Sequence, residues 1–158
     1  GYGGMMSKLI TANRGFTLIE IISVLLVIGI LSAVAISRMV FSHQDVDNTA
    51  RVEKLKTQLR YAQSRAMNTD EIWGIEFSGT SYHLFSNGNT SNKVQFPGED
   101  SVDISLPSGT SITQTVSFDK NRGRPCTDAA GTTPATNDIT LNVGGKTIRI
   151  VRNTGYIP

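Results

Sequence analysis

The stretch Gly15-Phe16-Thr17-Leu18-Ile19-Glu20 opens an apolar run that covers residues 16–36. This run holds 21 residues, and its only charged side chain is that of Glu20. At about 1.5 Å per residue, a helix of this length can cross a hydrocarbon core of about 30 Å. A carboxylate inside such a helix costs free energy unless it is paired, so Glu20 is a candidate functional residue.

The residues before the run form a short polar segment that contains Lys8 and Arg14. We interpret residues 1–15 as a leader peptide outside the fold. Residues 16–39 are then predicted to form a transmembrane helix. The two basic residues of the leader favour a cytoplasmic N-terminus, although Arg38 lies just beyond the other end of the run.

Two other interpretations of the apolar run stay open. Ala33-Val34-Ala35 resembles the small-residue cleavage site of a secretory signal, which would release a soluble domain that begins at Ile36. An uncut signal anchor would explain the length of the run. Neither accounts for Glu20 or for the position of Arg14 and Gly15 directly before Phe16.

The basic leader, the Gly-Phe junction, the glutamate at fixed spacing and the apolar helix together resemble the class III signal of type IV pilins and type II secretion pseudopilins. The resemblance implies cleavage by a prepilin peptidase between Gly15 and Phe16, methylation of the Phe16 amine and a role for Glu20 in filament assembly. It also implies three kinds of partner: other pilins, an inner-membrane assembly platform and membrane lipid. The Glu20 carboxylate would pair with the Phe16 ammonium of a neighbouring subunit.

The charge balance argues against a dedicated nucleic-acid binder. The chain carries 15 basic and 13 acidic residues, and the two basic residues of the leader leave 13 of each in residues 16–158. Cys126 is the only cysteine, so no intrachain disulfide can form. If it is exposed, Cys126 is available to bridge to another subunit or to a small thiol.

Residues 40–69 are predicted to continue the helix on the periplasmic side. Pilins often carry a proline after the apolar run, but here the first proline is Pro97, and the weakest helical stretch is 42–48. After it, apolar residues recur at spacings of three and four and form one stripe: Val52, Leu55, Leu59, Ala62 and Ala66. Lys54, Lys56, Arg60 and Arg65 lie off this stripe and are expected to face solvent. A single apolar stripe needs a sheet to cover it.

Alternating apolar residues after position 70 predict that sheet. The expected strands include positions 73–77, 82–84, 94–96, 102–106, 116–118, 139–143 and 148–150, with 87–92 as a polar loop and Gly144-Gly145 as a turn. Five to seven strands behind one long helix predict an α+β fold: a long N-terminal helix with an antiparallel sheet packed on its C-terminal half, as in the pilin fold. Residues 70–158 would form the β-rich domain.

Three further segments, 59–67, 118–125 and 153–157, are similar to the GspH/FimT-type minor pseudopilins. Within that group the chain is similar to minor subunits of mannose-sensitive haemagglutinin pili. The resemblance implies a low-copy subunit that primes or caps a filament.

Catalytic and metal-binding patterns are absent from the sequence, so we expect no enzyme and no cofactor. His43 and His83 are far apart, and His83 is expected to be a solvent-facing strand residue. Lys120, Arg122 and Arg124 place three positive charges in one loop. They could contact about three phosphates, as in a DNA-uptake pilin, or form an ordinary solvated loop.

Overall fold

The computed structural model describes residues 15–158, apart from the side chains of residues 37–45. The predicted leader up to residue 14, and the side chains of Arg38 and His43, lie outside the described residues. The described elements are helix α1 (Leu18–Asn68) and strands β1 (Trp73–Gly79), β2 (Ser81–Ser86), β3 (Asn89–Val94), β4 (Ile104–Ser105), β5 (Ile112–Phe118), β6 (Pro125–Cys126), β7 (Ile139–Val143) and β8 (Lys146–Ile150). The chain divides into two compact units, residues 1–42 and residues 43–158. The α+β layout predicted from the sequence is confirmed.

In the first unit, α1 is apolar on every side. Its segment Leu18–Ile36 is long and apolar enough to cross a membrane by length and composition, and none of it is buried. The isoleucine, leucine and valine side chains of this segment each expose at least 50% of their surface. Because exposed apolar surface is costly in water, this part of α1 needs lipid or other apolar helices to cover it.

The backbone of α1 is helical through residues 42–48, where the sequence predicts the weakest helix. Residues such as serine, aspartate and asparagine disfavour a helix by less than about 1 kcal/mol each. An ion pair one turn apart, between Arg51 Nε and Asp47 Oδ2 at 3.1 Å, supports the end of this stretch.

The second unit is built around the predicted apolar stripe of α1. All five stripe residues are at most 2% exposed, which confirms the prediction. They belong to one core with side chains from the strands, among them Ile75, Phe77 and Val116. Of the basic residues off the stripe, Lys54, Arg60 and Arg65 are exposed and Lys56 is half-buried.

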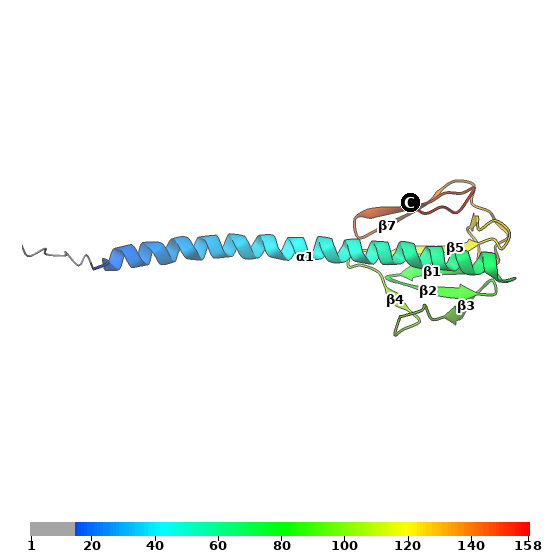
Figure 1. The fold of residues 1–158 in the computed structure, drawn as a ribbon, viewed down its shortest axis with the longest axis horizontal. Coiled ribbons are helices and arrows are strands. Elements are labelled where there is room, and N and C mark those ends of the chain that lie inside the picture. The colour runs from blue at the N-terminus through cyan, green and yellow to red at the C-terminus, as the bar shows by residue number, and fades with distance from the viewer. Residues whose placement is uncertain (1–14) are drawn as a thin grey trace, which may run out of the picture. The chain divides into compact units, whose positions relative to one another are not determined.

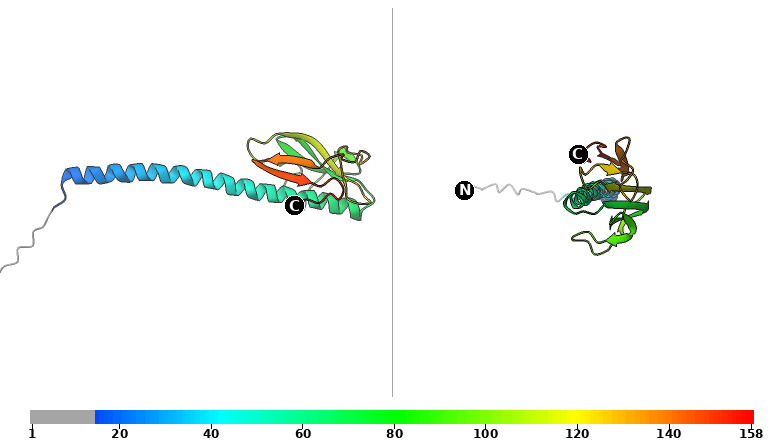
Figure 2. Two further views of the ribbon diagram at one scale, coloured as in Figure 1. Left: turned by 90° about the horizontal axis from the view of Figure 1, so that it is seen from above. Right: turned by 90° about the vertical axis from the view of Figure 1, so that its right-hand side faces the viewer.

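The strands form two antiparallel sheets rather than the single sheet expected from the sequence. The six-stranded sheet has the order β3-β2-β1-β5-β6, with β4 pairing with β2, and β7 pairs with β8 in a separate hairpin. Figure 1 shows the strands gathered along the C-terminal part of α1, and Figure 2 shows the β7-β8 hairpin beside the larger sheet. Both sheets contribute to the core through residues such as Leu84 and Ile148.

The segment 87–92, predicted to be a polar loop, is mostly strand β3. Asn87 and Gly88 have φ values of 57° and 64°, so they form the left-handed two-residue turn that joins hairpin strands. Strand β3 lies at the edge of its sheet and most of its side chains are exposed. An edge strand of this kind carries no apolar alternation, which is why the apolar pattern did not reveal it.

Two other strand assignments differ from the predictions. Of residues 102–106, only the two residues of β4 pair with β2, at Ser81 and Tyr82. The rest of that edge of β2 is already taken by β3, which pairs from Leu84 to Ser86. The short strand β6, which contains Cys126, was not predicted because two residues carry no periodic signal.

Candidate functional site

The predicted signal lies where the chain enters α1. Residues 15–17 are not helical, and Thr17 forms the N-cap of the helix. The Glu20 N–H lies 3.3 Å from Thr17 Oγ1 and 3.1 Å from the Thr17 carbonyl oxygen. The Ile21 N–H donates to the same carbonyl at 3.2 Å. The sequence analysis missed this role of Thr17, although a threonine three residues before a glutamate is a known capping pattern.

The peptide bond between Gly15 and Phe16 is open to solvent. Phe16 is 78% exposed. A Cβ atom built on Gly15 would have no atom within 4 Å. The bond therefore lies in an exposed, non-helical segment immediately before a capped helix, the kind of segment that proteases reach most readily.

Glu20 lies in the first turn of α1 and is exposed. Among the described residues, its carboxylate takes part in no hydrogen bond or ion pair. It lines a shallow hollow of about 250 Å³ together with Phe16, Ile21, Val24 and Leu25. A negative charge at this position interacts favourably with the positive end of the helix dipole, and it remains available to a cationic partner.

The loop that carries the three predicted basic residues is organised by Asp119. Its Oδ1 accepts the backbone N–H groups of Asn121, Arg122 and Gly123 at 2.6–3.1 Å, and its Oδ2 accepts Nε of Arg124 at 2.9 Å. Burial raises the pKa of Asp119, but these donors outweigh it and hold the pKa below its ordinary value. The backbone N–H groups of residues 121–123 are thus already occupied by a carboxylate.

This arrangement leaves little of the basic cluster free. Lys120 Nζ lies 2.7 Å from Asp70 Oδ1, and Arg124 is held by Asp119. Arg122 is exposed, and its guanidinium has no hydrogen bond or ion pair within the described part of the chain. Of the three predicted charges, two are therefore balanced by neighbouring carboxylates.

Gln63 connects the three segments that carry the narrower family resemblance. Its Nε2 donates to the carbonyl oxygens of Gly123 at 2.8 Å and Thr154 at 3.1 Å. One turn earlier on the same helix, Arg60 Nη2 donates to the carbonyl oxygen of Ile157 at 2.9 Å, and Ile157 is 1% exposed. Local sequence patterns give no signal for contacts between residues that are so far apart in the sequence.

His83 is buried, so the prediction that it faces solvent is wrong. Its Nε2 lies 3.0 Å from the Thr90 carbonyl oxygen and 3.2 Å from Glu76 Oε2, and its Nδ1 lies 3.5 Å from Asp103 Oδ1. Thr90 belongs to β3 and Asp103 precedes β4, and the sequence did not predict that these segments flank the ring. No group of three or more His, Cys, Asp and Glu residues within the described ranges could hold a metal ion.

Cys126 is fully buried in β6 rather than exposed in a loop. Its Sγ lies 3.6 Å from the Gly131 carbonyl oxygen. Burial raises the pKa of the Cys126 thiol, and the carboxylates of Asp128 and Asp119 raise it further. Because its thiol is buried, Cys126 is not available in this fold for a disulfide to another subunit or to a small thiol.

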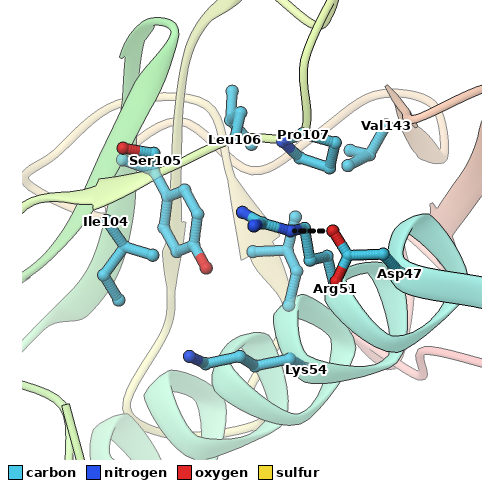
Figure 3. Close-up of a pocket in the computed structure, with 10 residues that line it drawn as sticks. Asp47, Arg51, Lys54, Ile104, Ser105, Leu106, Pro107 and Val143 are labelled. Carbon is cyan, nitrogen blue, oxygen red and sulfur yellow. Dashed lines mark hydrogen bonds and ion pairs between the residues drawn. The ribbon is translucent and has the colours of Figure 1, made fainter. Parts of the chain in front are cut away.

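A cavity of about 290 Å³ lies in the second unit between α1 and residues 104–107. Figure 3 shows Arg51, Asp47 and Lys54 of α1 along one side of it and the segment from Ile104 to Pro107 along the other.

The polar groups of this cavity are engaged by neighbouring residues. The Tyr82 hydroxyl donates to Gln58 Oε1 at 2.6 Å, and Lys54 Nζ lies 2.6 Å from Glu99 Oε1. Burial raises the pKa of Tyr82, and the Glu99 carboxylate adds to this.

Residues 10–36 match the model of the prokaryotic N-terminal methylation motif. The matched segment contains Gly15, Phe16, Glu20 and the apolar part of α1. Comparisons with curated proteins and with solved structures find no match. The motif supports a type IV pilin-like protein that is processed by a prepilin peptidase and assembles with other pilins.

The backbone at Gly155 packs closely against the loop that contains Gly123. A Cβ on Gly155 would lie 2.1 Å from the Gly123 carbonyl oxygen, and φ of Gly155 is +66°. We expect Gly155→Ala to lower the free energy of unfolding by about 2 kcal/mol or more, from backbone strain plus the clash.

Gly145→Ala is the matched control, because φ of Gly145 is +77° but no atom lies within 4 Å of its Cβ position. The Gly145→Ala variant should lose about 1 kcal/mol in the free energy of unfolding, from backbone strain alone. Denaturant unfolding of the full chain in detergent micelles can be followed by the fluorescence of Trp73, the only tryptophan. Equal losses for the two variants would contradict the described contact.

Proposed function

We propose that this chain is a minor pilin or pseudopilin, a structural subunit of a type IV pilus or a type II secretion filament. The observation that carries the proposal is the exposed apolar helix Leu18–Ile36 behind an open Gly15–Phe16 bond, with Glu20 as its single charge. A helix that is apolar on all sides is stable only in lipid or among similar helices, and a filament of packed helices supplies the second environment.

In this proposal, prepilin peptidase removes residues 1–15 and the new Phe16 amine is methylated. Residues 16–39 anchor the subunit in the bacterial inner membrane with a cytoplasmic N-terminus, and the inner-membrane assembly platform extracts it into the filament. Residues 40–69 and 70–158 then lie in the periplasm, or outside the cell once assembled. The Phe16 ammonium of a neighbouring subunit pairs with the Glu20 carboxylate and offsets the cost of that charge inside an apolar layer.

The narrower assignment is to the GspH/FimT-type minor pseudopilins, and within them to a subunit like MshC of mannose-sensitive haemagglutinin pili. Gln63 supports this assignment because it holds together two of the three similar segments from its place in the third. Because the three segments contact one another, a change in one of them affects the packing of the other two. This gives one physical reason why the three sequence similarities occur together in one chain.

The mature N-terminus tests the processing step directly. We expect the terminal peptide of the membrane-isolated protein to begin at Phe16 with a methylated amine, as measured by mass spectrometry. A start at Ile36 would instead identify a secreted soluble domain. An uncut leader would identify a signal anchor, and either result would overturn the proposed function.

If Glu20 acts in assembly, replacing it should reduce incorporation of the subunit into filaments without affecting cleavage of the leader. Glu20→Gln keeps the shape of the side chain but removes its charge, so the variant should be cut normally yet appear in sheared filaments at a tenth of the wild-type amount or less, since about 1.4 kcal/mol corresponds to a factor of ten. Glu53→Gln is the control, because the Glu53 side chain is exposed and Lys56, one turn away on α1, holds it in an ion pair. Normal incorporation of the Glu20→Gln variant would contradict the pairing.

DNA binding in an uptake system is the second candidate function, through Lys120, Arg122 and Arg124. The observation in its favour is the exposed Arg122 guanidinium, whereas the other two cations are paired with Asp70 and Asp119. If this function holds, Arg122→Ala should weaken binding to duplex DNA and reduce the salt dependence by about one phosphate contact.

Gel shifts of the full chain in detergent micelles at increasing salt can measure this effect. The exposed Lys146 on the β7-β8 hairpin provides the control variant Lys146→Ala. Our main proposal predicts equal retention for the wild type and both variants. Selective loss in Arg122→Ala would favour the uptake function.

A further inference from the structure

The start of α1 is fixed by one side chain. Thr17 accepts the Glu20 N–H with its hydroxyl and carbonyl oxygens and the Ile21 N–H with its carbonyl oxygen, so the helix begins at Leu18. A capped start defines which residues are helical and which are not. Here the boundary falls two residues after Gly15, and the bond between Gly15 and Phe16 stays outside the helix.

We propose that Thr17 is a positioning residue for leader cleavage, because its cap keeps the Gly15–Phe16 bond outside the helix and accessible. This inference rests on the proposed function. In the cleavage step, water adds to the Gly15 carbonyl carbon and the bond to the Phe16 nitrogen breaks. The products are a Gly15 carboxylate and a Phe16 ammonium, so the atoms of water are divided between the two new ends.

The position of the helix start matters because helical peptide groups are poor protease substrates. Extended segments offer their N–H and C=O groups to a binding partner, whereas a helix uses these groups internally. Upstream of Thr17, the nearest residues that favour an N-cap are Gly15 and Asn13. A helix that started from either one would bring the Gly15–Phe16 peptide group to its first turn.

Within residues 15–158, the cap also leaves the Glu20 carboxylate without a partner. In a complete capping box, the glutamate side chain would return to the N–H of the threonine. Only the half in which Thr17 accepts from the Glu20 N–H is present among the described contacts. Thr17 therefore stabilises the helix start without using the carboxylate that assembly needs.

The test compares residues that cap with residues that do not. Thr17→Val keeps the branched shape but loses the hydroxyl, and Thr17→Ala loses both. Thr17→Ser and Thr17→Asp keep an oxygen that can accept the Glu20 N–H. We expect Ser and Asp variants to be cut at rates near that of the wild type and Val and Ala variants to be cut about fivefold more slowly, which is the typical strength of an N-cap.

The measurement uses the full chain in detergent micelles with a purified prepilin peptidase, and the rate is read from the appearance of the peptide that begins at Phe16. Amide hydrogen exchange of Glu20 in the uncut chain provides the second readout. Its N–H should be protected in the wild type and the Ser and Asp variants and less protected in the Val and Ala variants. Residue 17 lies outside the core of residues 52–157, so these variants leave the second unit intact.

Two outcomes would overturn the inference alone: equal cleavage of all variants, or an Asp variant cut as slowly as the Ala variant. The second would mean that the peptidase reads the hydroxyl itself rather than the cap. If the wild-type chain is not cut between Gly15 and Phe16, the proposed function fails, and the inference fails with it. Cleavage that follows the capping series, together with the protection of the Glu20 amide, supports it.

Discussion

The burial of one apolar stripe of α1 is the interaction on which residues 43–158 depend. Val52, Leu55 and Leu59 would be exposed on an isolated helix, and the strands cover them with side chains such as Ile75 and Phe77. Each fully buried large apolar side chain contributes about 1.5–3 kcal/mol. None of the described residues buries the part of α1 from Leu18 to Ile36, so its stability depends on the environment that it enters.

Local periodicity allowed the sequence to predict the stripe and most of the sheet. The spacing of Val52 to Ala66 and the alternation around Ile75 and Leu141 are signals carried by neighbouring residues, and the structure agrees with them. Strand β3 and the short strands β4 and β6 were missed or misjudged. Their existence depends on which edge of β2 or β5 is free, and that information is not local.

The same difference between local and non-local information applies to the candidate site. The Gly15–Phe16 junction and Glu20 could be predicted because the signal is one contiguous segment, and the motif match covers the same residues. The environments of His83 and Cys126 could not be identified from sequence. Asp103 flanks the ring of His83, and Cys126 pairs with Ser117 and Pro134, but a strand pattern does not show what packs over its outer face. The ion pairs of Lys120 and Arg124 with Asp70 and Asp119 likewise became visible only in the folded chain.

The contacts of Gln63 and Arg60 bear on the order in which the domain folds. Arg60 and Ile157 are 97 positions apart in sequence, and Gln63 and Thr154 are 91 apart. Closing loops of this length costs entropy before any contact is gained, so we expect these bonds to form late in folding. The helix and the β1-β2 hairpin can pair while the rest of the chain is still being made. The hydrogen bonds from Arg60 and Gln63 can form only after residues 154–157 have been made. We therefore expect a chain interrupted before residue 154 to form α1 and the β1-β2 hairpin without these hydrogen bonds.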